Sequence, residues 1–147
     1  MISAQDRRWI ARTIREADKS DHYFRVGATV VVAKRASTAH NVIRNSPLIA
    51  WQAASTHAEE AALSRAYALG RGGTIYIARI GRKGRPLPSH PCSRCMPQII
   101  NSGIKRIVFF DGDAWQSYRI SSDGMPAMRS FSTRGRALHP ELDTSAD

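Results

Sequence analysis

The chain has 147 residues, a length that suits one domain with a buried core. Hydrophobic residues make up 42% and charged residues 23%, as in ordinary globular proteins, and no apolar run is long enough for an integral membrane protein. Lysine and arginine number 22 against 12 acidic residues, and a net charge of +10 attracts phosphates on nucleotides or polynucleotides.

The first half of the chain predicts one helix, two strands and a second helix. Residues 2–18 carry apolar side chains at helical spacing. They include acids and lack the apolar segment of a secretory signal, so we expect a cytoplasmic protein without a membrane partner. The β-branched run 26–33, VGATVVVA, predicts a buried strand, and residues 37–41 are expected to return beside it. Residues 42–55 look irregular, and Thr56 then begins a helix as its N-cap, with Glu59 completing a capping box.

The second half alternates strands with a helix. We expect strands over 74–80, 105–110 and 115–120, and a helix over 91–101 that begins with proline. A tight turn at 111–113 cannot hold a parallel crossover, so the last two strands should be antiparallel neighbours. The whole order predicts an α/β domain of three layers over residues 1–121. Residues 122–147 are expected to form a tail that is partly disordered or packed on the domain.

Both cysteines, Cys92 and Cys95, lie in the short run SHPCSRC. Two cysteines cannot build a disulfide framework, so the pair indicates metal or redox chemistry. One interpretation is a thioredoxin-like redox pair. A second is a structural zinc site closed by His57 and His90. A third is a catalytic zinc site with three protein ligands and one open position for water.

The stretch THAEE favours the catalytic zinc site. His57 at the start of a helix is a suitable zinc ligand, and Glu59 follows two residues later. A carboxylate there can accept a proton from a metal-activated water, although Glu59 can also be a simple capping residue. His-x-Glu followed by Pro-Cys-x-x-Cys is the pattern of zinc-dependent nucleobase deaminases.

On these motifs the chain resembles the cytidine and deoxycytidylate deaminase superfamily, in particular its short, often phage-borne members. The matching pieces are VGATVVV, HNVIRNSP, THAEEAAL, GGTIYIARI, SHPCSRC and INSGIKRIVFFDGD. The resemblance implies a cytidine deaminase-like fold, in which helices cover both faces of a five-stranded mixed sheet. It also implies a homo-oligomer, because members of the family commonly form dimers or tetramers.

The resemblance assigns roles to individual residues. His57, Cys92 and Cys95 would hold one Zn²⁺ per chain. Glu59 would take the proton of the attacking water and return protons to the base and to the departing ammonia. The substrate contacts would come from Asn41 at the sugar and from backbone groups near Ala58 and Pro91 at the base. Apart from the resemblance, Arg44 in the run RNSP beside Asn41 either binds a substrate phosphate or is a solvated loop charge.

Three functions remain open from the sequence. The first is conversion of cytosine to uracil in a free nucleoside or nucleotide, such as cytidine, deoxycytidine or a monophosphate. The second is the same reaction on single-stranded DNA or RNA, which the basic charge favours. The third is a zinc-stabilised nucleic-acid-binding module without catalysis, which a fourth ligand from His90 would support.

Several residues around the motifs have two interpretations. We expect His90 to be solvated or to lie behind the metal ligands, with contact to the substrate as the alternative. Arg79 ends a strand and can point toward the site. The basic loop of residues 81–90 either grips a phosphate or is simply solvated. His22 is expected to be a surface residue.

Overall fold

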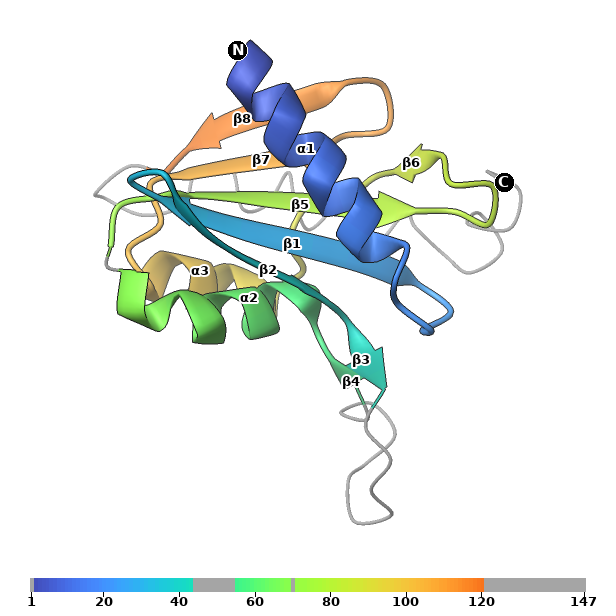
Figure 1. Ribbon diagram of the computed structural model, residues 1–147, viewed down its shortest axis with the longest axis horizontal. Helices are drawn as coiled ribbons and strands as arrows, with labels where there is room; N and C mark the ends of the chain where they lie inside the picture. The colour runs from blue at the N-terminus through green and yellow to red at the C-terminus, as the bar shows by residue number, and fades with distance from the viewer. Residues whose placement is uncertain (1, 44–54, 70, 121–147) are drawn as a thin grey trace.

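The computed structural model describes residues 2–43, 55–69 and 71–120. A central sheet separates one helix from two others, so the three predicted layers are present (Figure 1). The elements are α1 (Ala4–Ala17), β1 (Arg25–Val32), β2 (Arg35–His40), β3 (Val42–Ile43), β4 (Ser55–Thr56), α2 (Ala58–Ala66), the 3-10 turn η2 (Tyr67–Leu69), β5 (Thr74–Ile80), β6 (Pro86–Leu87), α3 (Cys95–Asn101), β7 (Arg106–Phe110) and β8 (Trp115–Arg119).

The sheet is mixed, and its five main strands follow the order β2-β1-β5-β7-β8. β5 and β7 are parallel, and the other neighbours along this path are antiparallel. The predicted antiparallel pairing of the last two strands is therefore confirmed. The short β6 adds a sixth strand beside the end of β5. The segment expected to be irregular begins and ends with β3 and β4, which pair as a two-stranded ribbon.

Each face of the sheet has its own core. Successive side chains of a strand point to opposite faces, so Ile75 and Ile77 of β5 lie on one side and Tyr76 on the other. The face of Ile75 and Ile77 packs against α2 and α3, where Met96 and Ile99 are fully buried. The opposite face carries α1 (Figure 1). The candidate site described below belongs to the α2 and α3 side.

Helix α1 lies very close to β1 at Gly27. A Cβ atom on Gly27 would collide with the carbonyl oxygen of Thr13 and would lie 2.7 Å from the backbone nitrogen of Ala17. The Thr13 and Thr29 hydroxyls also share a buried hydrogen bond of 2.8 Å. A side chain at position 27 would therefore push the helix away from the sheet, which explains why glycine interrupts the β-branched run.

A buried ionic cluster fixes the other end of α1. The carboxylate of Asp6 is 3% exposed and accepts hydrogen bonds of 2.8 and 2.7 Å from the Arg106 guanidinium on β7. The Tyr76 hydroxyl donates a third bond of 2.7 Å, and the backbone N–H of Ser3 a fourth. The Arg106 guanidinium holds the pKa of Asp6 well below its usual range. One carboxylate thus links the helix start to two strands.

Replacing Asp6 by asparagine is expected to lower the free energy of unfolding by about 2–3 kcal/mol at pH 7, because Arg106 loses its charged partner. The folded-state pKa of Asp6 is depressed, so its stabilisation is present above the ordinary pKa of 3.8 and is lost as the pH falls below it. Urea titrations should therefore show a gap between Asp6→Asn and wild type that narrows below about pH 4. Asp113→Asn, on an exposed turn, is the matched control. Equal stability of Asp6→Asn and wild type at pH 7 would contradict this role.

Within the described residues, no helix has both the length and the apolar composition needed to cross a bilayer.

Candidate metal and active site

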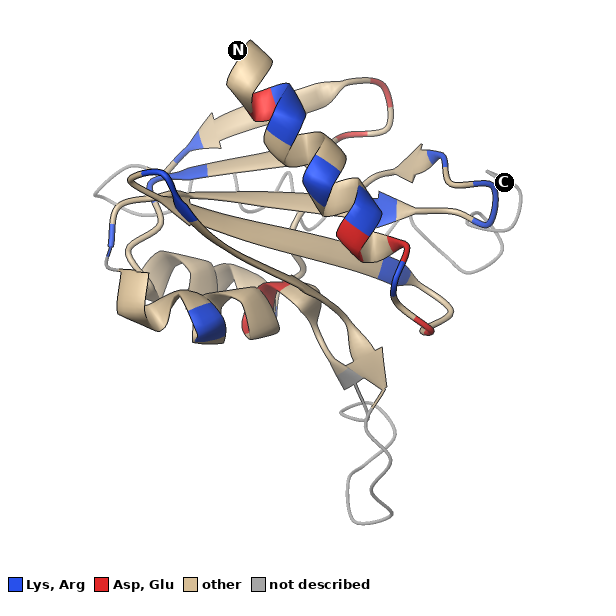
Figure 2. Ribbon diagram, viewed as in Figure 1, with Lys and Arg blue, Asp and Glu red and all other residues tan. Residues whose placement is uncertain are grey.

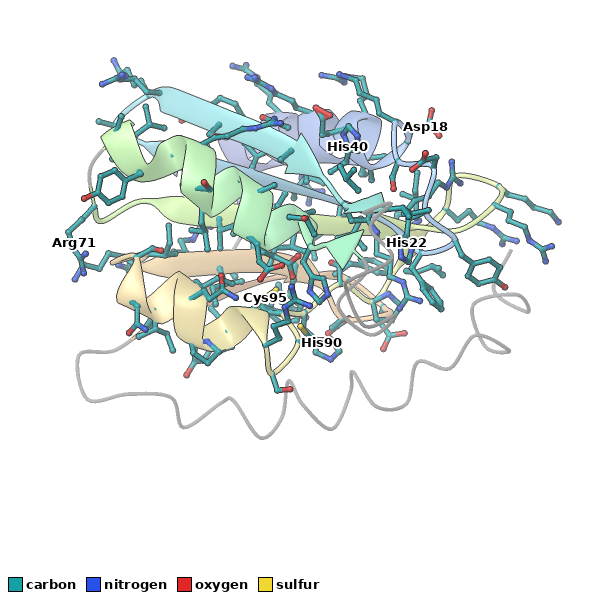
Figure 3. All side chains as sticks on the ribbon, turned by 90° about the horizontal axis from the view of Figure 1, so that it is seen from below. Asp18, His22, His40, Arg71, His90 and Cys95 are labelled. Carbon is teal, nitrogen blue, oxygen red and sulfur yellow. The ribbon has the colours of Figure 1, made fainter. Side chains whose placement is uncertain are left out.

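Three predicted metal ligands converge between the start of α2 and the turn that leads into α3. The Nδ1 atom of His57 lies 3.2 Å from the Sγ atom of Cys95 and 3.6 Å from that of Cys92. The donor atoms of all three residues lie within 4.8 Å of one another. Figure 3 shows Cys95 near the N-terminal ends of α2 and α3. Residues 35 and 38 positions apart in the sequence thus meet, as the resemblance implied.

The geometry of this cluster suits zinc. In a tetrahedral site, Zn–S bonds of about 2.3 Å and Zn–N bonds of about 2.0 Å place the nitrogen and sulfur donors roughly 3.5 Å apart. The two measured nitrogen–sulfur distances lie on either side of that value. One imidazole and two sulfurs also form a typical donor set for zinc, and three protein ligands leave one coordination position open. Among the described residues the cluster has three ligands, one fewer than a closed structural site.

A hydrogen bond between the two thiols moves their pKa values in opposite directions. A hydrogen bond from Cys95 lowers the pKa of Cys92 to about 4, with a further contribution from His57. The same bond raises the pKa of Cys95. Contact with the Cys92 sulfur also raises the pKa of His57. The lowered pKa of Cys92 favours its thiolate, which is the form that binds a metal ion.

The start of α2 differs by one residue from the prediction. The N-cap is His57 rather than Thr56, and its backbone N–H donates to the Oε1 atom of Glu60 at 3.0 Å. Glu60 also accepts two hydrogen bonds from Arg94 and one from Gln98, which join the starts of α2 and α3. Glu60, which holds these two helix ends together, was not predicted from the sequence. The adjacent pair Glu59–Glu60 was the only signal for it, because the N-cap position decides which of the two closes the box.

Glu60, and not Glu59, closes the capping box of α2, so the cap does not explain Glu59. Its side chain is 6% exposed, and burial raises its pKa to about 7. The charges of Cys92 and His57 also act on the pKa of this carboxyl, so it lies within electrostatic range of these two metal ligands. A buried carboxyl of near-neutral pKa next to a metal site can both accept and release a proton.

The start of α3 also differs from the prediction. The helix was expected from Pro91, but it begins at Cys95 after a turn. The backbone N–H groups of Cys95 and Met96 donate to the carbonyl oxygen of Cys92. The turn lets Cys92 stay exposed while Cys95 is buried in the first helical turn. This bend gives the two sulfurs different surroundings.

Three of the four residues that were predicted to contact the substrate lie in the described part of the chain. Ala58 and Pro91 are fully buried next to metal ligands in the sequence. Asn41 is buried at the end of β2, where its Oδ1 atom accepts from Ser20 and Val26 and its amide donates to the carbonyl oxygen of Phe24. Its side chain therefore orders the segment before β1. Arg44 lies outside the described residues, as does the predicted tail 122–147.

His90 and His22 are less exposed than predicted. His90 is 9% exposed and packs edge-on against Phe109, with ring centroids 6.1 Å apart, so the expectation that it is solvated is wrong. It does not join the metal group found among the described residues. His22 is half-buried, and burial together with the charge of His57 lowers its pKa. It belongs to the surroundings of the site rather than to a remote surface.

Comparisons with known proteins agree with this geometry. Residues 3–111 match the family described as the cytidine and deoxycytidylate deaminase zinc-binding region. No curated protein matches the chain in sequence. Among solved structures, cytidine deaminase from Burkholderia pseudomallei is 22% identical with a TM-score of 0.60, and the match covers 77% of this chain and 91% of that one.

Two further structures have the same fold. The dCMP deaminase of cyanophage S-TIM5 is 18% identical with a TM-score of 0.57, over 90% of this chain and 95% of that one. Cytidine deaminase from Mycobacterium leprae is 25% identical with a TM-score of 0.52, over 74% and 88%. His57, Cys92 and Cys95 are placed to hold the zinc ion of this family. With its zinc-ligand cluster and a family match over most of its length, the chain belongs to the cytidine and deoxycytidylate deaminase family.

Proposed function

We propose that the protein hydrolyses the exocyclic amino group of cytosine in a free nucleoside or nucleotide, giving uracil and ammonia. The observation that carries the proposal is the buried carboxyl of Glu59 beside three zinc ligands. A purely structural zinc site has no use for such a carboxyl. The capping function that could have explained Glu59 is performed by Glu60 instead.

The reaction is a substitution by water at C4 of the ring. A C–O bond forms, the C–N bond to the amino group breaks, and nothing is oxidised or reduced. Zinc, when bound, lowers the pKa of a coordinated water to near neutrality. Glu59 accepts the proton of the attacking water, donates one to the ring nitrogen, and delivers one to the leaving ammonia. Its burial excludes solvent that would compete for these protons.

The remaining predicted contacts have positioning roles in this proposal. Backbone groups near Ala58 and Pro91 orient the base, because both residues are buried directly beside metal ligands. Asn41 acts at the sugar end, either by direct contact or by holding the segment of Phe24. Arg44 is proposed to bind a substrate phosphate.

Replacing Asn41 by alanine should raise KM more than it lowers kcat, which steady-state kinetics would measure.

The antiparallel pairing of β7 and β8 supports a free substrate, because it resembles the cytidine branch of the superfamily more than the polynucleotide-editing branch. The net charge of +10 supports the second candidate, deamination of cytosine in single-stranded DNA or RNA. A non-catalytic module is the weakest of the three functions, since His90 does not join the metal cluster.

We further propose that the protein acts in the cytoplasm as a homo-oligomer. The exposed apolar side chains of Val42, Ile43 and Tyr67 support contact with another copy of the chain. Light scattering coupled to size exclusion would measure the mass of the assembly.

The direct test incubates zinc-loaded protein with cytidine, deoxycytidine, their monophosphates and a short cytosine-containing single strand. Mass spectrometry reads uracil formation, and a coupled assay reads ammonia. Turnover of a monomer supports the proposal, and turnover of the oligonucleotide alone moves the function to polynucleotide deamination. Absence of turnover on every substrate by folded, zinc-loaded protein would reject both enzymatic functions.

A further inference from the structure

Helix α1 carries a straight row of arginines on its exposed face. Arg8, Arg12 and Arg15 follow one another at intervals of four and three residues, which keeps them on one side of a helix. At 3.6 residues per turn, the three side chains leave the helix within about 60° of one another. Figure 2 shows basic residues recurring along this helix. We call Arg8, Arg12 and Arg15 the basic stripe of α1.

The basic stripe lies opposite the buried side of the helix. The buried residues of α1 are Asp6, Ile10, Thr13 and Ala17. Their mean direction is about 160° from that of the stripe around the helix axis. Among the described residues, α1 is the only helix on this face of the sheet, since α2 and α3 pack on the other (Figure 1). The stripe therefore faces away from the sheet along a single helix.

None of the three arginines forms an ion pair within the part of the chain that the structure describes. The acidic side chains of α1 and of its C-cap have other partners, in the ion pairs Asp6–Arg106, Glu16–His40, Glu16–Lys19 and Asp18–Arg25. The guanidinium carbon of Arg12 lies 5.4 Å from the centre of the Trp9 ring, a contact that leaves its charge in place. The stripe thus presents uncompensated positive charge.

The stability of the helix gains nothing from the stripe. Arg8 and Arg12, like Arg12 and Arg15, are neighbours on the helix surface, and like charges at these spacings destabilise a helix. Side chains of opposite sign at the same positions would stabilise the helix and keep it soluble. The stripe is therefore unfavourable for the chain alone, and an anionic partner would offset that cost.

The phosphates of a nucleic acid suit the stripe better than a lipid surface does. Guanidinium groups bind phosphate oxygens through paired hydrogen bonds. The stripe is about 10 Å long, and a DNA duplex carries one phosphate charge per roughly 1.7 Å of its axis, so several phosphates fall within its length. A helix that binds lipid inserts its apolar side chains, whereas Ile10 and Ile14 of α1 are packed on the sheet.

Double-stranded DNA fits the stripe better than a single strand or double-stranded RNA. Proteins that bind single strands stack the bases on aromatic side chains, but the stripe has none and Trp9 packs against the core beneath α1. The major groove of B-DNA is about 12 Å wide and admits a helix, whose diameter is about 10–12 Å. The major groove of an RNA duplex is too narrow for one.

We propose that the basic stripe of α1 binds the phosphate backbone of double-stranded DNA. The binding has no sequence preference, because phosphate contacts carry no sequence information. The three clustered metal ligands belong to the α2 and α3 side of the sheet, so DNA on α1 leaves them accessible. The inference goes beyond the proposed function and does not depend on it.

The test measures the affinity of zinc-loaded protein for a short fluorescent DNA duplex by anisotropy at several salt concentrations. A variant with Arg8→Gln, Arg12→Gln and Arg15→Gln loses three phosphate contacts but keeps residues of similar helix propensity. Its affinity should fall about 10- to 100-fold at about 0.1 M salt, and the slope of log K against log salt should decrease by about 2.7. Lysine at the same three positions should retain most of the affinity, because it keeps the charge.

The matched control combines Arg65→Gln, Arg71→Gln and Lys83→Gln, which removes three charges from exposed positions outside α1. Both triple variants have the same net charge, so the control should bind the duplex more tightly than the stripe variant. An equal loss in the two variants would overturn the proposal, since it would indicate general charge. Absence of duplex binding by wild type at low salt would also overturn it, as would tighter binding to a single strand, to duplex RNA or to anionic vesicles.

A competition experiment tests whether the DNA and the metal site occupy different faces. Saturating uridine, an uncharged ligand for the metal site under the proposed function, should leave the affinity for the duplex unchanged. Displacement of the duplex by uridine would place the DNA at the metal site and overturn the inference. Duplex binding that depends on the stripe, in a protein that deaminates nothing, would leave the inference standing and reject the proposed function. Deamination without duplex binding would have the opposite meaning.

Discussion

Replacing Glu59 by glutamine is expected to lower kcat by about 10²- to 10⁴-fold, the usual contribution of a positioned general acid–base group. Glutamine keeps the size of the side chain but cannot accept the proton of the attacking water. The zinc content, measured by atomic emission, should remain near one ion per chain because Glu59 is not one of the three clustered ligands. The loss should therefore appear in turnover and not in metal binding.

Glu16→Gln provides the control for the loss of a carboxylate. Glu16 lies on α1, on the opposite face of the sheet, where it pairs with His40. This variant should keep its turnover. Retention of full activity by Glu59→Gln would show that Glu59 does not transfer protons, and the proposed mechanism would have to be abandoned.

Replacing Cys95 by serine is expected to have the second large effect. Cys95 is fully buried in the first turn of α3, and its sulfur is 3.2 Å from the ligating nitrogen of His57. Zinc affinity should fall by more than about 100-fold, since even residues that only orient a ligand contribute up to that much. Turnover should fall to background, and the thermal midpoint should drop because the metal joins α2 to α3.

Competition with a chromophoric chelator measures the zinc affinity of Cys95→Ser against that of wild type. Removal of zinc from wild type by a strong chelator should reproduce the loss of activity, and added zinc should restore it. Ser93→Ala is the matched control, because Ser93 is exposed between the two cysteines and is not among the clustered ligands. Normal zinc binding by Cys95→Ser would contradict the assignment of this ligand.

Local sequence patterns predicted the elements that depend on local chemistry. The strand at 74–80 was predicted with its observed bounds, because the β-branched run is bounded by glycines on both sides. The antiparallel pairing of β7 and β8 followed from the length of the turn alone. The metal cluster was predicted from two motifs whose residue types and spacing suit one ion.

Features that depend on tertiary packing could not be predicted in the same way. The sequence contains two neighbouring glutamates after His57, and only the hydrogen bond from the His57 backbone N–H to Glu60 shows which one closes the cap. The burial of His90 depends on Phe109, which is distant in the sequence. A cavity lined by Arg79 forms where β1, β5 and the loop after β5 come together. A local sequence pattern does not show which distant segments lie side by side in the fold.

The central claim is that water replaces the amino group of cytosine at the site of Glu59 and the three zinc ligands. The most direct measurement is conversion of a cytosine nucleotide by zinc-loaded protein in H₂¹⁸O, with mass spectrometry of the base and quantification of ammonia. We expect uracil that carries one ¹⁸O atom, one ammonia for each uracil, and loss of both products in Glu59→Gln. Folded protein with one bound zinc that forms no uracil from nucleoside, nucleotide or single strand would contradict the account.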